Sequence, residues 1–190
     1  MSPRARLDHT NVIEAAAKLV DEEGIERLTL GHLAERLNIR TPSLYNHVTG
    51  LPGLMHDLAL YCLRDILDRV TRAAIGKSRS DAIFAFATTY LLYAREFPGR
   101  YTLTQAPDPN DQAVQDLARQ IVDAVRAILA PYNLSEEDTI HAIRGLRSIV
   151  QGFISLEIAG GFRIAIDTDA SFHWLITLFI TGLERKTGTQ

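Results

Sequence analysis

One stretch of the sequence decides how the rest is interpreted: Arg40-Thr41-Pro42-Ser43-Leu44-Tyr45-Asn46-His47-Val48. We expect it to form a short helix with Thr41 as its N-cap, since a threonine hydroxyl can accept from the free N–H groups of a first turn. Pro42 then takes the first helical position, where its missing N–H group costs nothing. At about 100° per residue, Leu44 and Val48 share one apolar side. The opposite face is small and polar, which suits a helix inserted into a DNA major groove.

The outward side chains of this stretch predict two kinds of DNA contact. Pro42, Ser43 and Asn46 point away from the apolar side and would meet base edges. Tyr45 and His47 lie on the two flanks, where long hydrogen-bonding side chains reach phosphates on both walls of a groove. The sequence therefore assigns base preference to the central residues and general affinity to the flanking ones.

A second helix precedes this stretch and would support it. Thr29 is a candidate N-cap, and apolar residues at Leu30, Leu33, Ala34 and Leu37 repeat at helical spacing. A three-residue turn, Asn38-Ile39-Arg40, then joins the two helices. Two helices joined by so short a turn are typical of a helix-turn-helix.

The helix pair resembles the DNA-binding motif of the TetR family of bacterial repressors. The resemblance covers roughly residues 11–60 and rests on Leu28-Thr29-Leu30, Leu33-Ala34 and the run from Thr41 to Val48. It implies a homodimeric repressor that binds a palindromic operator, with half-sites about one helical turn apart or a little more. The residues expected to contact DNA are Thr29, Arg40, Thr41, Pro42, Ser43, Tyr45, Asn46 and His47. The family usually has a phosphate-binding lysine at the start of the next helix, where this sequence has Leu51.

Composition sets limits on the class of protein. The chain has 190 residues, 46% of them hydrophobic, and a formal charge of −3, which indicates a globular rather than a disordered protein. Residues 1–50 carry a net charge of −1, so DNA affinity must come from local cations such as Arg4, Arg6, Arg36 and Arg40. The single cysteine, Cys62, excludes an internal disulfide and fits a reducing cytoplasm as a buried thiol. We expect no signal peptide, no membrane span and a cytoplasmic location.

The remaining sequence predicts helices only, so the expected fold class is all-α in two domains. Residues 1–50 would form a three-helix domain whose first helix ends near Glu23, with Gly24 as a left-handed cap. A connecting helix follows at about 51–75. Residues 76–190 would form a helical ligand-binding and dimerisation domain. It would contain a loop at 76–80, an irregular segment at 98–110 with a short helix at 100–105, and long helices at about 81–97, 111–130, 135–159 and 169–186.

The last two helices are apolar on more than one side. A surface helix needs only one apolar stripe, so these helices must be buried on two sides. We expect one side to face the core and the other to face a second copy, with a monomeric core as the alternative. The residues assigned to dimerisation are Ile149, Phe153, Trp174, Leu175, Leu178 and Phe179. TetR relatives also dimerise through their last two helices. Residues 147–160 resemble the C-terminal class named after a Trp-His-Gly motif, of which only Gly152 is present, with Gln151 in the His position.

Aromatic and amide side chains in the middle of the second domain predict a site for a small molecule. An apolar cavity with a few polar groups is the usual form of such a site. The candidates are Phe84, Thr88, Tyr93, Tyr101, Gln105, Gln120 and Gln151. Any one of them is more often a core residue than a ligand contact, and it is the group that indicates a site. The expected effector is an apolar or aromatic molecule that lowers operator affinity.

The sequence offers little support for an enzyme. It lacks a glycine-rich phosphate loop, a pair of cysteines and a His-Glu-x-x-His motif, so we expect neither catalytic residues nor a metal or other cofactor. The alternative to a DNA-binding regulator is a helical dimer that binds a ligand or a protein without DNA. The Tyr45 and His47 pair beside a small polar face argues against that alternative.

Overall fold

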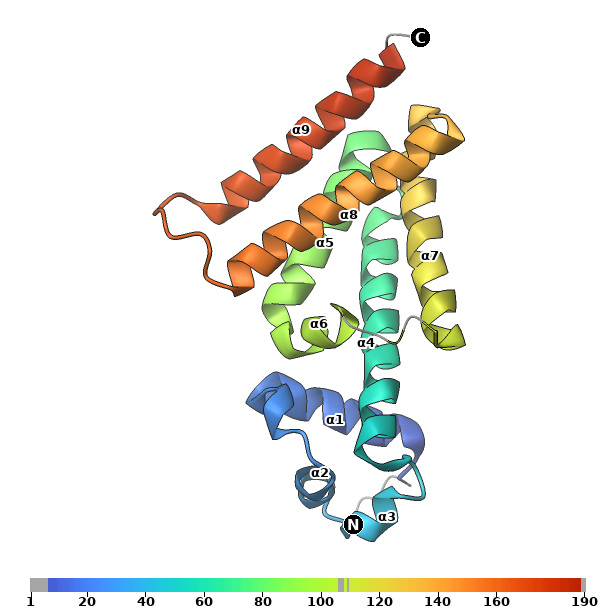
Figure 1. Cartoon of the computed structure of the whole chain (residues 1–190), viewed down its shortest axis with the longest axis vertical. Helices are drawn as coiled ribbons and strands as arrows, with labels where there is room; N and C mark the ends of the chain where they lie inside the picture. Colours follow the sequence, from blue (N-terminus) through green and yellow to red (C-terminus); the bar gives the residue numbers. More distant parts are fainter. Residues whose placement is uncertain (1–6, 106–107, 109, 189–190) are drawn as a thin grey trace. The chain divides into compact units, whose positions relative to one another are not determined.

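The computed structural model describes residues 7–105, 108 and 110–188, and every regular element in these ranges is a helix (Figure 1). The all-α prediction is therefore confirmed. The chain divides into two compact units: Met1–Asp65 with Glu96–Gln115, and Ile66–Arg95 with Asp116–Gln190. The domain boundaries expected from the sequence, at residues 50 and 76, stay a prediction.

The first unit is built on five helical segments at the N-terminus. They are α1 (His9–Glu23), the 3-10 helix η1 (Ile25–Arg27), α2 (Leu30–Arg36), α3 (Thr41–Leu44) and α4 (Gly50–Ala74), of which α4 continues into the second unit. Asp8 caps α1 by accepting from the Asn11 N–H at 2.8 Å. The core between these helices is fully apolar, and Cys62 is buried in it, as expected.

Two helix ends in this unit differ from the prediction. The N-cap of α3 is Arg40, which is extended at φ −85° and ψ 141°, and Thr41 is already helical and makes no capping bond. Thr41 as a cap is therefore wrong, and Pro42 lies one residue further into the first turn. Gly24 has φ 87° as expected, but its ψ of 160° is not that of a left-handed helical residue. That conformation turns the chain into η1 instead.

The first unit also includes α6 (Pro98–Gln105), which contacts α1. The sequence predicts an irregular segment with helix from Arg100 only, whereas the helix begins at Pro98. Proline is favoured in the first turn of a helix, so Pro98, which the sequence suggests as a helix breaker, starts α6 instead. The close contact requires Gly99, because a Cβ there would lie 2.6 Å from a methyl group of Val20.

Arg100 is the buried charge that fixes α6 to α1. Its Nε donates to Asp21 Oδ1 at 2.8 Å, and its Nη1 donates to Asp65 Oδ2 at 3.4 Å. Its guanidinium also lies 4.5 Å from the ring centroid of Phe97. The guanidinium therefore connects three segments of the first unit.

The second unit contains the long helices of the C-terminal part. These are α5 (Arg79–Glu96), α7 (Gln112–Leu129), the 3-10 helix η2 (Ala130–Tyr132), α8 (Glu136–Ile158) and α9 (Thr168–Gly188). Ser135 caps α8 by accepting from the Asp138 N–H at 3.1 Å, which confirms the predicted start. The predicted loop at 76–80 is shorter than expected, since α5 already begins at Arg79 with a left-handed φ of 50°.

The helices α8 and α9 run side by side, as Figure 1 shows. Aromatic residues fill the space near their connection, where the Phe153 ring lies 5.0 Å from that of Phe172 in an edge-on arrangement. Arg95 of α5 holds both ends of that connection, because it donates to Glu157 at 2.7 Å and to Asp169 at 2.6 Å. The hydrogen bonds from Arg95 hold the pKa of Glu157 below its usual range.

Candidate nucleic-acid interface

The position of α3 is fixed by α2 and the turn between them. Thr29 caps α2 as predicted, since its hydroxyl accepts from the His32 N–H at 3.1 Å. Asn38 then adopts a left-handed φ of 53°, and the Ile39 N–H returns to the Ala34 carbonyl at 3.0 Å. Asparagine tolerates this conformation better than most residues. The turn therefore sets the angle at which α3 leaves α2.

The segment from α3 to Val48 has one buried and one open side. Leu44 is fully buried and Val48 nearly so, as predicted. The N–H groups of His47 and Val48 both donate to the Leu44 carbonyl, at 2.8 and 3.0 Å, so the segment continues as a turn after the helix ends. This turn keeps Tyr45, Asn46 and His47 beside α3.

The open side carries the polar groups that DNA contact requires. Tyr45 is 61% exposed, Pro42 and Asn46 are exposed, and Ser43, Thr41 and His47 are half-buried. Among the described residues, none hydrogen-bonds to the side chains of Tyr45, Asn46 or His47. A phenol, an amide and an imidazole are thus available to an external partner. These groups can bind phosphate oxygens and base edges.

Charge on this surface is arranged differently from what the sequence indicates. Arg36 is bound to Glu22 at 2.5 Å and lies 3.8 Å from Glu23, so its charge is largely neutralised within the protein. Arg40 is exposed and has no carboxylate partner in the described part of the chain. Arg4 and Arg6 lie outside the described residues. Within those residues, Arg40 is the cation next to α3 that is available for phosphate.

The start of α4 borders the same surface. Thr49 lies against Gly53, where a Cβ would come within 2.1 Å of the Thr49 hydroxyl oxygen. Leu51 is exposed in the first turn of α4. An exposed leucine cannot bind phosphate as the family's lysine does, so backbone N–H groups and the Thr49 hydroxyl are the polar groups at this edge.

Comparison with known proteins agrees with this architecture. Residues 83–179 match the family described as tetracyclin repressor-like, C-terminal domain. The uncharacterized HTH-type transcriptional regulator YobS of Bacillus subtilis (strain 168) is 34% identical over 96% of each chain. The chain belongs to the TetR family of transcriptional regulators. The uncharacterized HTH-type transcriptional regulator Rv0681 of Mycobacterium tuberculosis is 35% identical over 96% of this chain and 84% of its own.

A solved TetR structure shows the same fold at lower identity. The crystal structure of a TetR variant from Acinetobacter baumannii AYE in complex with minocycline matches with a TM-score of 0.70 and 23% identity, over 96% of this chain and 99% of the other. The Trp-His-Gly class of the C-terminal domain stays a prediction. In the described part of this TetR-family chain, no helix is long and apolar enough to cross a membrane. No cluster of metal-binding side chains occurs in that part either.

The candidate effector residues fall in both units. Tyr101 and Gln105 belong to the first unit, and the other five belong to the second. Tyr93 and Tyr101 are buried, Phe84 and Gln151 are half-buried, and Thr88, Gln105 and Gln120 are exposed. Two of the amides have internal partners: Gln105 donates to Thr104, and Gln151 accepts from Arg147. Their grouping into one effector site stays a prediction.

The candidate dimerisation residues separate into two classes. Trp174 is 61% exposed and Leu178 is 49% exposed, whereas Phe153 is buried within its own subunit. Ile149, Leu175 and Phe179 are half-buried. The exposed side chains are the ones that a second copy could cover.

A further set of apolar residues on the same face was not expected from the sequence. Leu156 at the end of α8 is exposed, and so are Phe162, Ile164 and Ile166 in the connection to α9. All of these except Ile164, together with Trp174 and Leu175, border an apolar groove of about 660 Å³. The alternation Phe162-x-Ile164-x-Ile166 is the sequence signal that could have identified them, because connecting segments are ordinarily polar.

Proposed function

We propose that this TetR-family regulator is a repressor that binds a palindromic operator as a homodimer and is released by a small apolar or aromatic molecule. The observation that carries the DNA-binding part is the open side of the segment from Thr41 to Val48. There the side chains of Tyr45, Asn46 and His47 have no hydrogen-bond partner among the described residues, and Leu44 and Val48 pack beneath them. In this proposal Pro42, Ser43 and Asn46 contact bases. Thr29, Arg40, Tyr45 and His47 contact phosphates.

The dimer is supported by apolar surface that a soluble monomer rarely exposes. Trp174, Leu178 and Leu156 lie on α8 and α9 next to an open apolar groove. Contiguous apolar patches of this kind usually mark a protein interface. Pairing α8 and α9 of each copy gives a four-helix interface with two-fold symmetry, which matches a palindromic operator.

Release by a ligand is supported by the continuity of α4. This helix begins beside α3 in the first unit and ends in the second, which contains five of the seven candidate effector residues. A ligand lowers operator affinity only if it binds the released state more tightly than the bound state. One relative that is 28% identical over 95% of this chain, the tetracycline repressor protein class A of Escherichia coli, is named after the small molecule tetracycline.

The test is a gel-shift titration with DNA from the region next to the protein's own gene, together with mapping of the protected sequence. Tyr45→Phe and His47→Ala should each weaken binding to specific and random DNA alike, because phosphate contacts carry no sequence information. Substitution of Asn46 should change base preference instead. His141→Ala is the matched control, since His141 is an exposed histidine in the second unit. Unchanged affinity in both phosphate-contact variants would refute the assignment.

The ligand part is tested separately by screening apolar and aromatic compounds for thermal stabilisation and repeating the gel shift with each hit. A true effector must raise the stability of the free protein and lower its operator affinity. A compound that stabilises the protein and leaves operator affinity unchanged argues against coupling between the two units.

A further inference from the structure

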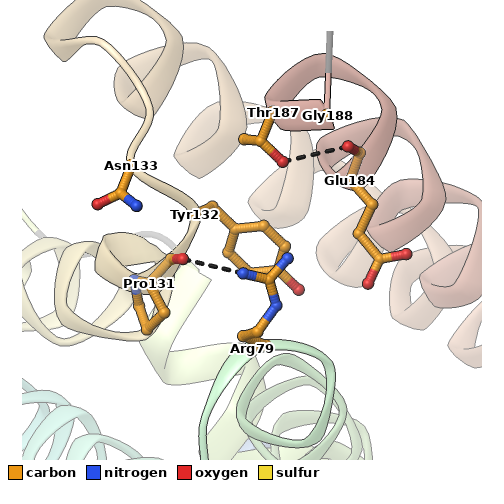
Figure 2. Close-up of a pocket in the computed structure, with 7 residues that line it drawn as sticks. All are labelled: Arg79, Pro131, Tyr132, Asn133, Glu184, Thr187 and Gly188. Atoms are coloured by element: carbon orange, nitrogen blue, oxygen red, sulfur yellow. Dashed lines mark hydrogen bonds between the residues drawn. The ribbon is translucent and has the colours of Figure 1, made fainter. Parts of the chain in front are cut away.

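A small polar pocket lies in the second unit, where the first turn of α5, the 3-10 helix η2 and the last turn of α9 meet (Figure 2). Its volume is about 330 Å³, within the roughly 300–1,000 Å³ that small-molecule sites occupy. The side chains around it are Arg79, Tyr132, Asn133, Glu184 and Thr187. None of them is among the candidate effector residues, so this pocket is separate from the effector site proposed above.

The strongest sign of a binding function is the hydroxyl of Tyr132. This residue is 1% exposed, and its hydroxyl has no hydrogen-bond partner in the described part of the chain. Buried hydroxyls are almost always hydrogen-bonded, so this unpaired one calls for an explanation. Burial and the nearby Glu184 carboxylate raise the pKa of Tyr132, which keeps the hydroxyl protonated as a donor.

Side chains of opposite charge border this pocket. The Arg79 guanidinium lies 4.6 Å from the Tyr132 ring centroid and donates to the Pro131 carbonyl at 3.0 Å. The Glu184 carboxylate lies on the other side of the hollow, and Figure 2 shows the tyrosine hydroxyl directed toward that side. Arg79 and Glu184 are both exposed, and they do not form an ion pair with each other. The pocket thus holds a cation and an anion apart.

Two residues beside the pocket have a left-handed backbone. Arg79 and Asn133 both have a left-handed φ of 50°. This conformation is ordinary for an asparagine that ends a helix, as Asn133 does after η2, but it is uncommon for an arginine. The two residues lie on different elements but border the same hollow, which is what a site held in a fixed shape requires.

We propose that this pocket binds a free α-amino acid with a short polar side chain. The ligand carboxylate would accept from Arg79 and from the Tyr132 hydroxyl, and the ligand ammonium would donate to Glu184. Arg79 is exposed and long, so it can turn toward the carboxylate and uncover the hydroxyl beneath it. The Asn133 side chain and the Thr187 oxygen would hydrogen-bond to the polar side chain of the ligand. A carboxylate and an ammonium on one small molecule match the separated charges of the pocket, whereas an apolar effector does not.

The test is calorimetric titration of the native full-length protein with L-serine, L-asparagine and L-glutamine. The tightest binder is then compared with the compounds that lack its amino group or its carboxylate. We expect saturable binding of at least one amino acid and at least tenfold weaker binding of both truncated compounds. Binding of the carboxylate-only compound as tightly as the amino acid would overturn the proposed class, and no saturable binding of any of the three would overturn the site.

Three substitutions locate the binding within this pocket. Of these three, Arg79→Met and Glu184→Gln should each weaken binding at least tenfold. A fourth variant, Arg126→Met, is the control and should leave binding unchanged, because this half-buried arginine of the same unit does not border the pocket. Tyr132→Phe should weaken binding and raise the melting temperature of the ligand-free protein, because it removes the unpaired hydroxyl. A lower melting temperature in Tyr132→Phe, or unchanged binding in all three variants, would refute the assignment. Operator binding without added amino acid reports that each variant is folded.

Discussion

Replacing Arg100 with methionine tests how the first unit holds α6 against α1. Arg100 is 8% exposed and is shared by the Asp21 and Asp65 carboxylates. Methionine keeps an apolar stem of similar length against Phe97 and removes the charge. The substitution therefore deprives both carboxylates of their shared cation and leaves little new cavity.

The expected magnitude follows from the burial of the three side chains. Removing one partner of a buried ion pair costs about 3–5 kcal/mol. The Asp21 and Asp65 side chains keep 19% and 22% exposure, so water can rehydrate them and the lower end, about 3 kcal/mol, applies. Each kcal/mol lowers the melting temperature by roughly 2–4 °C in a chain of this size, so the expected fall is roughly 6–12 °C.

The measurement is thermal unfolding followed by circular dichroism at one fixed protein concentration, since the stability of a dimer depends on concentration. Arg126→Met is the matched control, because Arg126 binds Glu136 at 2.8 Å with both side chains exposed, and surface pairs contribute little. An equal fall in melting temperature in Arg100→Met and Arg126→Met would refute the reasoning. The double variant Arg100→Met with Asp21→Leu should recover part of the loss, since it also removes one of the two carboxylates left without their cation. A further loss would show that packing rather than charge sets the cost.

Three more outcomes are expected. Leu178→Arg should dissociate the dimer and leave the subunit folded, because Leu178 is half-exposed in one subunit. Sedimentation measures the oligomeric state, and the control Leu92→Arg, at a similarly exposed leucine on α5, should stay dimeric. Arg40→Ala should lower operator affinity and reduce the slope of log K against log salt by about 1, as expected for one lost phosphate contact in a gel-shift salt series. Glu157→Gln should flatten the acid side of a plot of melting temperature against pH. Because Arg95 lowers the pKa of Glu157 in the folded state, the stabilisation is full above a pH of about 4.3 and is lost as the pH falls further. An unchanged acid limb in that variant would contradict the role of the ion pair.

Local sequence signals located most helices of this protein. The Thr29 and Ser135 caps and the apolar spacing of α2 and α8 depend on residues within one or two turns, so they can be seen in the sequence. The same holds for Leu44 and Val48, whose burial follows from helical geometry. The Thr41 cap was wrong because the extended conformation of Arg40 already turns the chain, which leaves Thr41 inside the helix.

Features that depend on distant residues could not be predicted in this way. Arg100 binds Asp21, which lies 79 residues earlier, and nothing local distinguishes it from an exposed arginine of an irregular segment. Arg36 was expected to contribute to DNA affinity, but it forms an ion pair with Glu22. The sequence does not show this pair, because α1 and α2 bring the two residues together only in the folded unit. The pocket beside Tyr132 likewise joins residues from α5, η2 and α9. Its only local signal was Pro131-Tyr132-Asn133 at the end of a helix.

The short length of α3 affects how the DNA specificity of such a regulator can change during evolution. A helix of four residues is too short to be stable alone, so its geometry is imposed by Leu44, by the turn at Asn38 and by the start of α4. The outward residues Ser43 and Asn46 contribute almost nothing to that geometry. They can therefore be exchanged with little loss of stability, and under the proposed base contacts a few substitutions at these positions would give a duplicated gene a new operator on an unchanged scaffold.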